Sequence, residues 1–145
     1  MMTEQNLYAG AAPVTLSETD PGRGCRRLLG RTVLITGAAR GIGFATAARL
    51  GAEGAQVWIA DRDEQALAQA LAAARTHGLT LRTLVLDSSD ATEVRQRLAA
   101  TLALAGRIDI LVNNAGGSLH TPYLFLEESD EDWARVMNLN LMGAV

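Results

Sequence analysis

Four short, almost uninterrupted apolar runs recur along the chain, and stretches with helical periodicity separate them. The runs are Val33 to Ile35, Val57 to Ala60, Leu84 to Leu86 and Ile108 to Val112. Short runs that are apolar at successive positions are typical of strands buried on both faces, as in a parallel sheet. The pattern therefore predicts four parallel strands.

A helix is expected after each apolar run. The four helices are predicted from Gly41 to about Gly54, from Asp63 to Gly78, from Asp90 onward, and from Ser129 to the end of the chain. Asp90 with Glu93 and Ser129 with Asp132 have the three-residue spacing of helix-capping pairs. The apolar side chains expected to face the sheet are Leu67, Leu71, Val94, Leu98 and Leu102.

Strands and helices that alternate in this way predict an α/β protein with a doubly wound parallel sheet. Each right-handed crossover must lay its helix on one face of the sheet. The expected strand order is 3-2-1-4. Residues 1–29 are rich in Gly, Pro, Ser and Thr without periodicity and are interpreted as a flexible extension, so the domain is predicted to occupy residues 30–145.

Composition narrows the class of protein. The chain has 145 residues, of which 48% are hydrophobic, and a net charge of -3, which gives no basic face for nucleic acid. Cys25 is the single cysteine, so neither an internal disulfide nor a thiolate metal cluster is expected. No apolar run approaches the roughly 18 residues of a membrane span. These features favour a cytoplasmic protein without a metal or a membrane partner.

The segment TGAARGIG, residues 36–43, falls where the first predicted strand meets the first helix. Free N–H groups and the positive end of a helix dipole would lie here, as a dinucleotide pyrophosphate requires. Gly37 can form the tight turn, Gly41 lets the backbone approach a phosphate, and Gly43 allows close packing of helix on strand. No lysine follows, so the segment is not a P-loop.

Asp61 ends the second predicted strand, 18 residues after Gly43. A carboxylate at this place can accept hydrogen bonds from an adenosine ribose and would repel a 2′-phosphate, which favours NAD over NADP. Arg40 and Arg62 flank the same place, and either guanidinium could pair with a phosphate, so NADP stays open as an alternative.

Four motifs in this order resemble the short-chain dehydrogenase/reductase family. TGAARGIG resembles the family's Thr-Gly-x-x-x-Gly-x-Gly turn, and NNAG, residues 113–116, resembles its motif after the fourth strand. Asp87 with Ser88 resembles the pair after the third strand that contacts adenine. The segment WARVMNLNLMG resembles the helix in which an Asn-Leu-x-Gly run carries a catalytic asparagine, which is Asn140 here.

The resemblance implies a Rossmann-like domain that binds a nicotinamide dinucleotide, with Asn140 in a catalytic role. Asn113 and Asn114 lie after a central strand, and their amides could tie neighbouring strands together. The positions expected to contact the cofactor are Gly37, Arg40, Gly41, Ile42, Gly43, Asp61, Arg62, Asp87, Ser88, Asn114, Ala115 and Gly116.

The family's chemistry is hydride transfer between the nicotinamide and an alcohol/carbonyl substrate, and complete members would be expected to form homo-oligomers. This chemistry needs a serine and a Tyr-x-x-x-Lys pair beyond the asparagine helix, whereas all 13 basic residues of this chain are arginine. We therefore expect an inactive N-terminal part of such an oxidoreductase, truncated before a fifth strand. The alternatives are a non-catalytic nucleotide-binding or interaction module and a truncated remnant.

Overall fold

The four predicted strands pair into one parallel sheet. The computed structural model describes residues 26–119 and 125–144, and the order of the strands in this part of the chain is β3-β2-β1-β4, as predicted. The strands are β1 (Thr32–Thr36), β2 (Gln56–Asp61), β3 (Leu81–Val85) and β4 (Ile110–Val112). Ile35 in β1 is in register with Ile59 in β2 and Val112 in β4. The carboxyl ends of these three strands therefore lie at the same edge.

All four strands differ from the predicted apolar runs, β1 and β2 by one residue at each end and β3 and β4 by more. The prediction placed β3 at Leu84 to Leu86, but it begins at Leu81, because the exposed Arg82 interrupts the apolar pattern while its guanidinium lies 5.3 Å from the centre of the Trp58 ring. β4 begins two residues later than predicted. Asp109 precedes it and contacts Thr32 twice. Its N–H donates to the Thr32 carbonyl at 2.8 Å, and its carboxylate, in place of a backbone carbonyl, accepts the Thr32 N–H at 2.9 Å.

The helices are α1 (Gly41–Ala52), α2 (Glu64–Thr76), α3 (Ala91–Ala105) and α4 (Asp130–Asn140), with short 3-10 turns at η2 (Phe125–Glu127) and η3 (Met142–Ala144). The predicted continuation of the last helix to the end of the chain is wrong. The Asn140 amide donates to the Val136 carbonyl at 2.8 Å and so competes with the helical backbone at this point. The backbone then tightens into η3.

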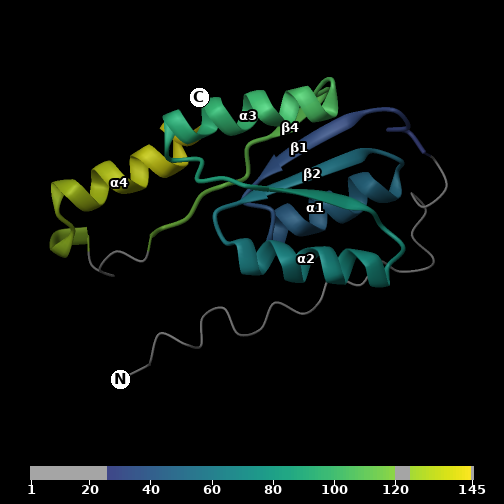
Figure 1. Cartoon of the computed structure of the whole chain (residues 1–145). Coiled ribbons are helices and arrows are strands. Elements are labelled where there is room, and N and C mark those ends of the chain that lie inside the picture. Colours follow the sequence, from purple (N-terminus) through teal and green to yellow (C-terminus); the bar gives the residue numbers. More distant parts are fainter. Residues whose placement is uncertain (1–25, 120–124, 145) are drawn as a thin grey trace.

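Helices cover both faces of the sheet, α1 and α2 on one face and α3 on the other (Figure 1). On the first face, Val33 and Ile35 of β1 pack with Ala47 of α1 and Leu67 of α2. The intervening Leu34 joins a smaller cluster on the second face, with Trp58, Ala60 and Leu86, against which Val94 and Leu98 of α3 pack. The alternation of side chains along β1 thus divides the core into two layers.

The expectation that Leu102 is buried is wrong, since 39% of its surface is exposed. Successive steps of four residues drift around a helix, so Leu102 lies about 80° from Val94, whereas Thr101 lies within about 20° of it. Thr101 is the one residue of α3 that is fully buried.

The flexible extension predicted over residues 1–29 falls mainly on residues 1–25, which lie outside the described part of the chain. Of its last residues, Leu28 packs against the core cluster of α1 and α2, and its N–H donates to the Glu53 carbonyl at 3.0 Å. The domain boundary at residue 30 stays a prediction.

Candidate functional site

The turn between β1 and α1 reverses the chain through two glycines with positive φ. Gly37 has φ of 60° and Gly41 has φ of 57°, a region that L-residues rarely adopt. Between them the backbone is held against β2, because Ala38 N–H donates to the Ala60 carbonyl at 3.1 Å and Ala39 N–H donates to the Asp61 carboxylate at 3.1 Å. The turn is therefore fixed between the two glycines by the end of β2.

Two of the three glycines are required by close contacts. A Cβ on Gly37 would lie 2.7 Å from the Ala115 Cα, and a Cβ on Gly43 would lie 2.6 Å from both the Gly37 oxygen and the Asn114 amide nitrogen. A Cβ on Gly41 would meet nothing within 4 Å, so this glycine is needed for its conformation alone. The open space at Gly41 fits the predicted approach of a phosphate.

The N-terminus of α1 differs from those of the other helices. The side chains of Asp63, Asp90 and Ser129 accept backbone N–H groups and so cap α2, α3 and α4, respectively. Within the described residues no side chain caps α1, whose N-cap residue is Arg40, and its first turn carries no acidic residue. The first N–H groups of α1 and its dipole can therefore serve an anion.

Asn114 joins the ends of β4 and β1, as the prediction for the NNAG motif required. Its amide nitrogen donates to the Thr36 carbonyl at 3.0 Å and to the Gly37 carbonyl at 2.9 Å. The Thr36 hydroxyl oxygen accepts the N–H groups of Asn114 and Ala115 at 3.1 and 3.0 Å. Asn113 does not share this role, because its amide donates instead to the Ala144 carbonyl at 3.0 Å.

Carboxylates and guanidiniums alternate at the ends of β2 and β3. Both oxygens of Asp61 are oriented by backbone, Oδ2 by Ala39 N–H and Oδ1 by Asp63 N–H at 3.2 Å. Arg40 forms an ion pair with Asp63. The Ser89 hydroxyl and N–H chiefly, and the charge of Arg62 to a smaller extent, lower the pKa of the Asp87 carboxyl below its ordinary value.

The turn before α1, the end of β2 and the segments after β3 and β4 border one cavity of about 780 Å³. It is lined by Thr36, Gly37, Arg40, Gly41, Ile42, Gly43, Ala60, Asp61, Arg62, Asp63, Leu86, Asp87, Ser88, Asn114, Ala115, Gly116 and Leu139. The structure thus brings together all twelve positions that the sequence assigned to a cofactor. Their contact with a cofactor stays a prediction.

Asn140 does not line this cavity in the described part of the chain. Its side-chain oxygen accepts the Gly117 N–H at 2.9 Å, and its amide donates to the Gly117 carbonyl at 2.8 Å. A Cβ on Gly116 would lie 2.6 Å from the same oxygen. The helix that carries Asn140 is therefore tied to the segment after β4.

Sequence reasoning missed two polar residues of this cavity. The sequence assigns Thr36 only to the turn motif, although its hydroxyl accepts two N–H groups of the NNAG segment. It assigns Asp63 only to a helix start, since the pairing of Asp63 with Arg40 depends on two turns that meet in space. Spacing along the chain carried no signal for either contact.

Residues 26–119 and 125–144 contain neither a metal-binding cluster nor a membrane-spanning helix. No group of three or more His, Cys, Asp or Glu side chains is arranged there to hold a metal ion. None of the helices described is both long enough and apolar enough to cross a membrane.

The fold and the arrangement at the edge of the sheet define a Rossmann-like α/β protein. The profile of the family described as short chain dehydrogenase matches residues 31–145. The chain therefore belongs to the short-chain dehydrogenase/reductase family, as its motifs indicated.

Named relatives and solved structures agree with this assignment. The chain is 42% identical to the short-chain reductase protein NovJ of Streptomyces niveus, over 77% of the chain and 42% of that protein. It is 37% identical to the 3-oxoacyl-[acyl-carrier-protein] reductase FabG of Thermotoga maritima, over 81% of the chain and 47% of that protein. An NAD+-bound xylitol dehydrogenase is similar with a TM-score of 0.74 and 34% identity, over 81% of the chain and 45% of that structure. The chain spans less than half the length of each of these relatives.

Proposed function

We propose that the cavity binds a nicotinamide dinucleotide, and that the chain supplies the cofactor-binding part of an oxidoreductase acting on an alcohol/carbonyl pair. The observation that carries this proposal is the uncapped N-terminus of α1, which follows a turn of two positive-φ glycines and shares a cavity with Asp61. An anion and a ribose are the two chemical groups that this combination would suit.

The residues that line the cavity fit the pyrophosphate, the ribose and the adenine of a nicotinamide dinucleotide. The open space at Gly41 and the free end of α1 suit the pyrophosphate, and the Asp61 carboxylate has lone pairs left for ribose hydroxyls after accepting one backbone N–H on each oxygen. By resemblance to the family, Asp87 and Ser88 would lie against adenine. Ile42, Ala115 and Gly116 also line the cavity.

The proposal favours NAD over NADP. Three carboxylates, those of Asp61, Asp63 and Asp87, and two guanidiniums line the cavity, so the local formal charge is negative. A 2′-phosphate would add two negative charges to this place, whereas a 2′-hydroxyl can donate to Asp61.

The catalytic part of the proposal is narrower. The nicotinamide would supply or accept the hydride. Asn140 fixes the end of α4 against Gly117, and by resemblance to the family Asn140 is the catalytic asparagine. The 145 residues contain no lysine and hence no Tyr-x-x-x-Lys pair. We therefore expect this polypeptide to bind the cofactor without turnover. The absence of lysine also favours a second candidate function, that of a non-catalytic nucleotide-binding module.

The same proposal includes a cytoplasmic location, based on composition, and a homo-oligomeric state of any longer form.

Steady-state assays with NADH and NAD on a panel of secondary alcohols and ketones test the absence of turnover. We expect rates at background. Turnover that Asn140→Ala abolishes would contradict the expectation and favour a complete enzyme.

Isothermal titration with NADH and NADPH tests the binding itself. We expect saturable binding of NADH, weakened about tenfold or more by Asp61→Ala, because two charge-assisted hydrogen bonds to ribose are lost. Asp130→Ala is the matched control, since Asp130 is an exposed aspartate in the first turn of α4 and should leave affinity unchanged. Absence of saturable binding by the folded chain would contradict the proposal.

A further inference from the structure

Arg40 lies within the phosphate turn, directly before Gly41, and forms an ion pair with Asp63. Both side chains line the main cavity, and both also line a smaller cavity of about 290 Å³ beside it. The Arg40 Nη2 donates to the Asp63 Oδ2. The two residues are separated by 23 positions and belong to different turns, the one before α1 and the one before α2.

Asp63 uses its two oxygens for two separate tasks. Oδ1 accepts the Ala66 N–H at 2.9 Å and caps α2, which leaves Oδ2 for Arg40. The Ala66 N–H chiefly, and the Arg40 guanidinium as well, lower the pKa of the Asp63 carboxyl below its ordinary value. The carboxylate is therefore charged at neutral pH.

The neighbouring contacts hold both turns in this arrangement. Ala39 N–H donates to Asp61 Oδ2, and Asp63 N–H donates to Asp61 Oδ1. The backbone on one side of Arg40 and the backbone of Asp63 itself are thus fixed by the same carboxylate. These contacts hold Arg40 and Asp63 within reach of each other.

We propose that Asp63 is a specificity-determining residue for the dinucleotide, because it holds Arg40 against the β2–α2 turn and neutralises its charge. This inference rests on the proposed function and adds the reason for its cofactor preference. A 2′-phosphate entering beside Asp61 would have to compete with Asp63 for the Arg40 guanidinium. Asp63 acts through Arg40 and is a positioning residue.

Asp63→Asn separates the two tasks of the side chain. Asparagine is as good a helix cap as aspartate, so its carbonyl oxygen can still accept the Ala66 N–H. The amide that replaces Oδ2 cannot accept from Arg40, so the guanidinium is released. Asp90→Asn is the matched control, since Asp90 caps α3 through Thr92 and Glu93 and lies outside the lining formed by the described residues.

The experiment measures NADH and NADPH affinities of the full chain by titration calorimetry, for the unmodified chain, Asp63→Asn, Arg40→Gln, their double variant and Asp90→Asn. We expect Asp63→Asn to shift the ratio of affinities toward NADPH by roughly tenfold, with a similar melting temperature. This shift in the affinity ratio should become smaller as the salt concentration is raised, because the side chains of Arg40 and Asp63 are both partly exposed. In the Arg40→Gln background, Asp63→Asn should change the ratio by about twofold or less, the effect of a screened charge alone.

Four results would overturn the inference. An unchanged ratio in Asp63→Asn would show that Arg40 is not restrained by Asp63. An equal shift in the Arg40→Gln background would show that the effect does not act through Arg40. An equal shift in Asp90→Asn would show that loss of an aspartate outside the described lining is sufficient. Failure of the folded, unmodified chain to bind either cofactor would contradict the proposed function itself, and the inference with it.

Discussion

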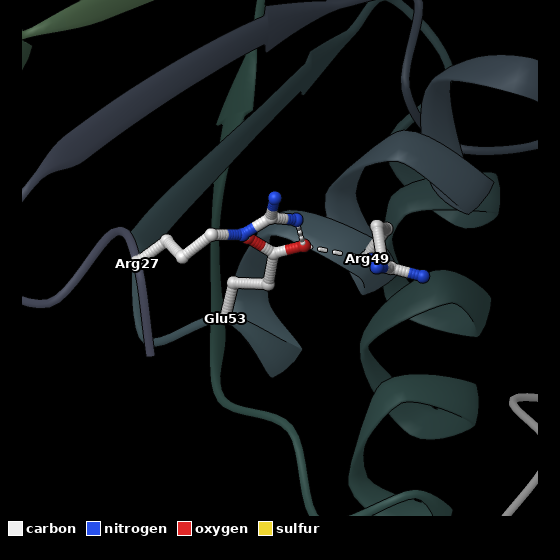
Figure 2. A network of polar contacts seen from close by, with 3 residues as sticks. All are labelled: Arg27, Arg49 and Glu53. Atoms are coloured by element: carbon white, nitrogen blue, oxygen red, sulfur yellow. Dashed lines mark hydrogen bonds and ion pairs between the residues drawn. The ribbon is translucent and has the colours of Figure 1, made fainter. Parts of the chain in front are cut away.

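The Glu53 carboxylate accepts a hydrogen bond from Arg27 Nε at 2.7 Å, across 26 positions of the chain. A second nitrogen of Arg27 and Arg49 Nε, at 2.9 Å, share the other oxygen of Glu53 (Figure 2). Only 5% of the Glu53 side chain is exposed. The segment before β1 is therefore attached to the C-terminal end of α1, and β1 enters the sheet at a fixed place.

This contact predicts a specific dependence of stability on pH. The hydrogen bonds from Arg27 first, and then those from Arg49, lower the pKa of Glu53 from its ordinary 4.5 to about 2. Because the folded-state pKa is the lower one, the stabilisation is complete above about pH 4.5 and is lost as pH falls toward 2. We expect Glu53→Gln to lower the melting temperature at pH 7 and to flatten this part of the profile.

Thermal unfolding followed by circular dichroism between pH 2.5 and 7 would measure the effect. Glu131→Gln is a suitable control, since Glu131 is exposed on α4 and its substitution should change the profile little. Parallel profiles for Glu53→Gln and the unmodified chain would mean that the Arg27 contact does not stabilise the fold.

Two glycines of α1 predict opposite effects of the same substitution. A Cβ at Gly43 would lie 2.6 Å from the Gly37 oxygen, so Gly43→Ala should destabilise the chain by about 2–3 kcal/mol. A Cβ at Gly51 would have its nearest neighbour at 3.7 Å, an ordinary contact, so Gly51→Ala should stabilise by about 0.5–1 kcal/mol. Urea unfolding of both variants gives the comparison, and equal effects would contradict the close packing of α1 on β1.

The adjacent asparagines after β4 predict different costs. Asn114→Asp would place a carboxylate against the carbonyl oxygens of Thr36 and Gly37, which should cost about 2 kcal/mol and abolish cofactor binding. Asn113 is exposed and donates a single hydrogen bond, to Ala144, so Asn113→Asp should cost well under about 1 kcal/mol. Urea unfolding with NADH titration would measure both, and a mild effect of Asn114→Asp would argue against its role between the strands.

The edge strand predicts association of the free chain. β4 lies at the end of the described sheet, and Leu111 at its centre is 55% exposed. Trp133 and Met137 on α4 are also exposed, as is Leu141 directly after its end. Unpaired backbone groups beside apolar side chains favour pairing with another chain, and a charge on such an edge opposes it.

We therefore expect concentration-dependent association in size-exclusion chromatography, reduced by Leu111→Lys. Leu104→Lys is the control, since Leu104 is 72% exposed but belongs to α3 and not to the edge strand, and its substitution should leave association unchanged. A sharp monomer peak for the unmodified chain across concentrations would refute the prediction.

The sequence alone determined the order of the strands, the starts of the helices and twelve of the seventeen residues that line the cavity. These depend on local signals: apolar runs for buried strands, Asp63, Asp90 and Ser129 for helix starts, and glycines where φ must be positive. A parallel sheet with right-handed crossovers then brings the carboxyl ends of its central strands together, whatever the details of packing.

Only the tertiary structure decided which partner each polar group takes. Arg40 could have faced a phosphate, yet it pairs with Asp63; Asn113 could have joined the strands, yet Asn114 does so alone. The end of α4 at Asn140 likewise depends on Gly117, 23 positions earlier. Such contacts form between turns that are distant in sequence, and their choice depends on distances of a few ångströms that residue spacing does not encode.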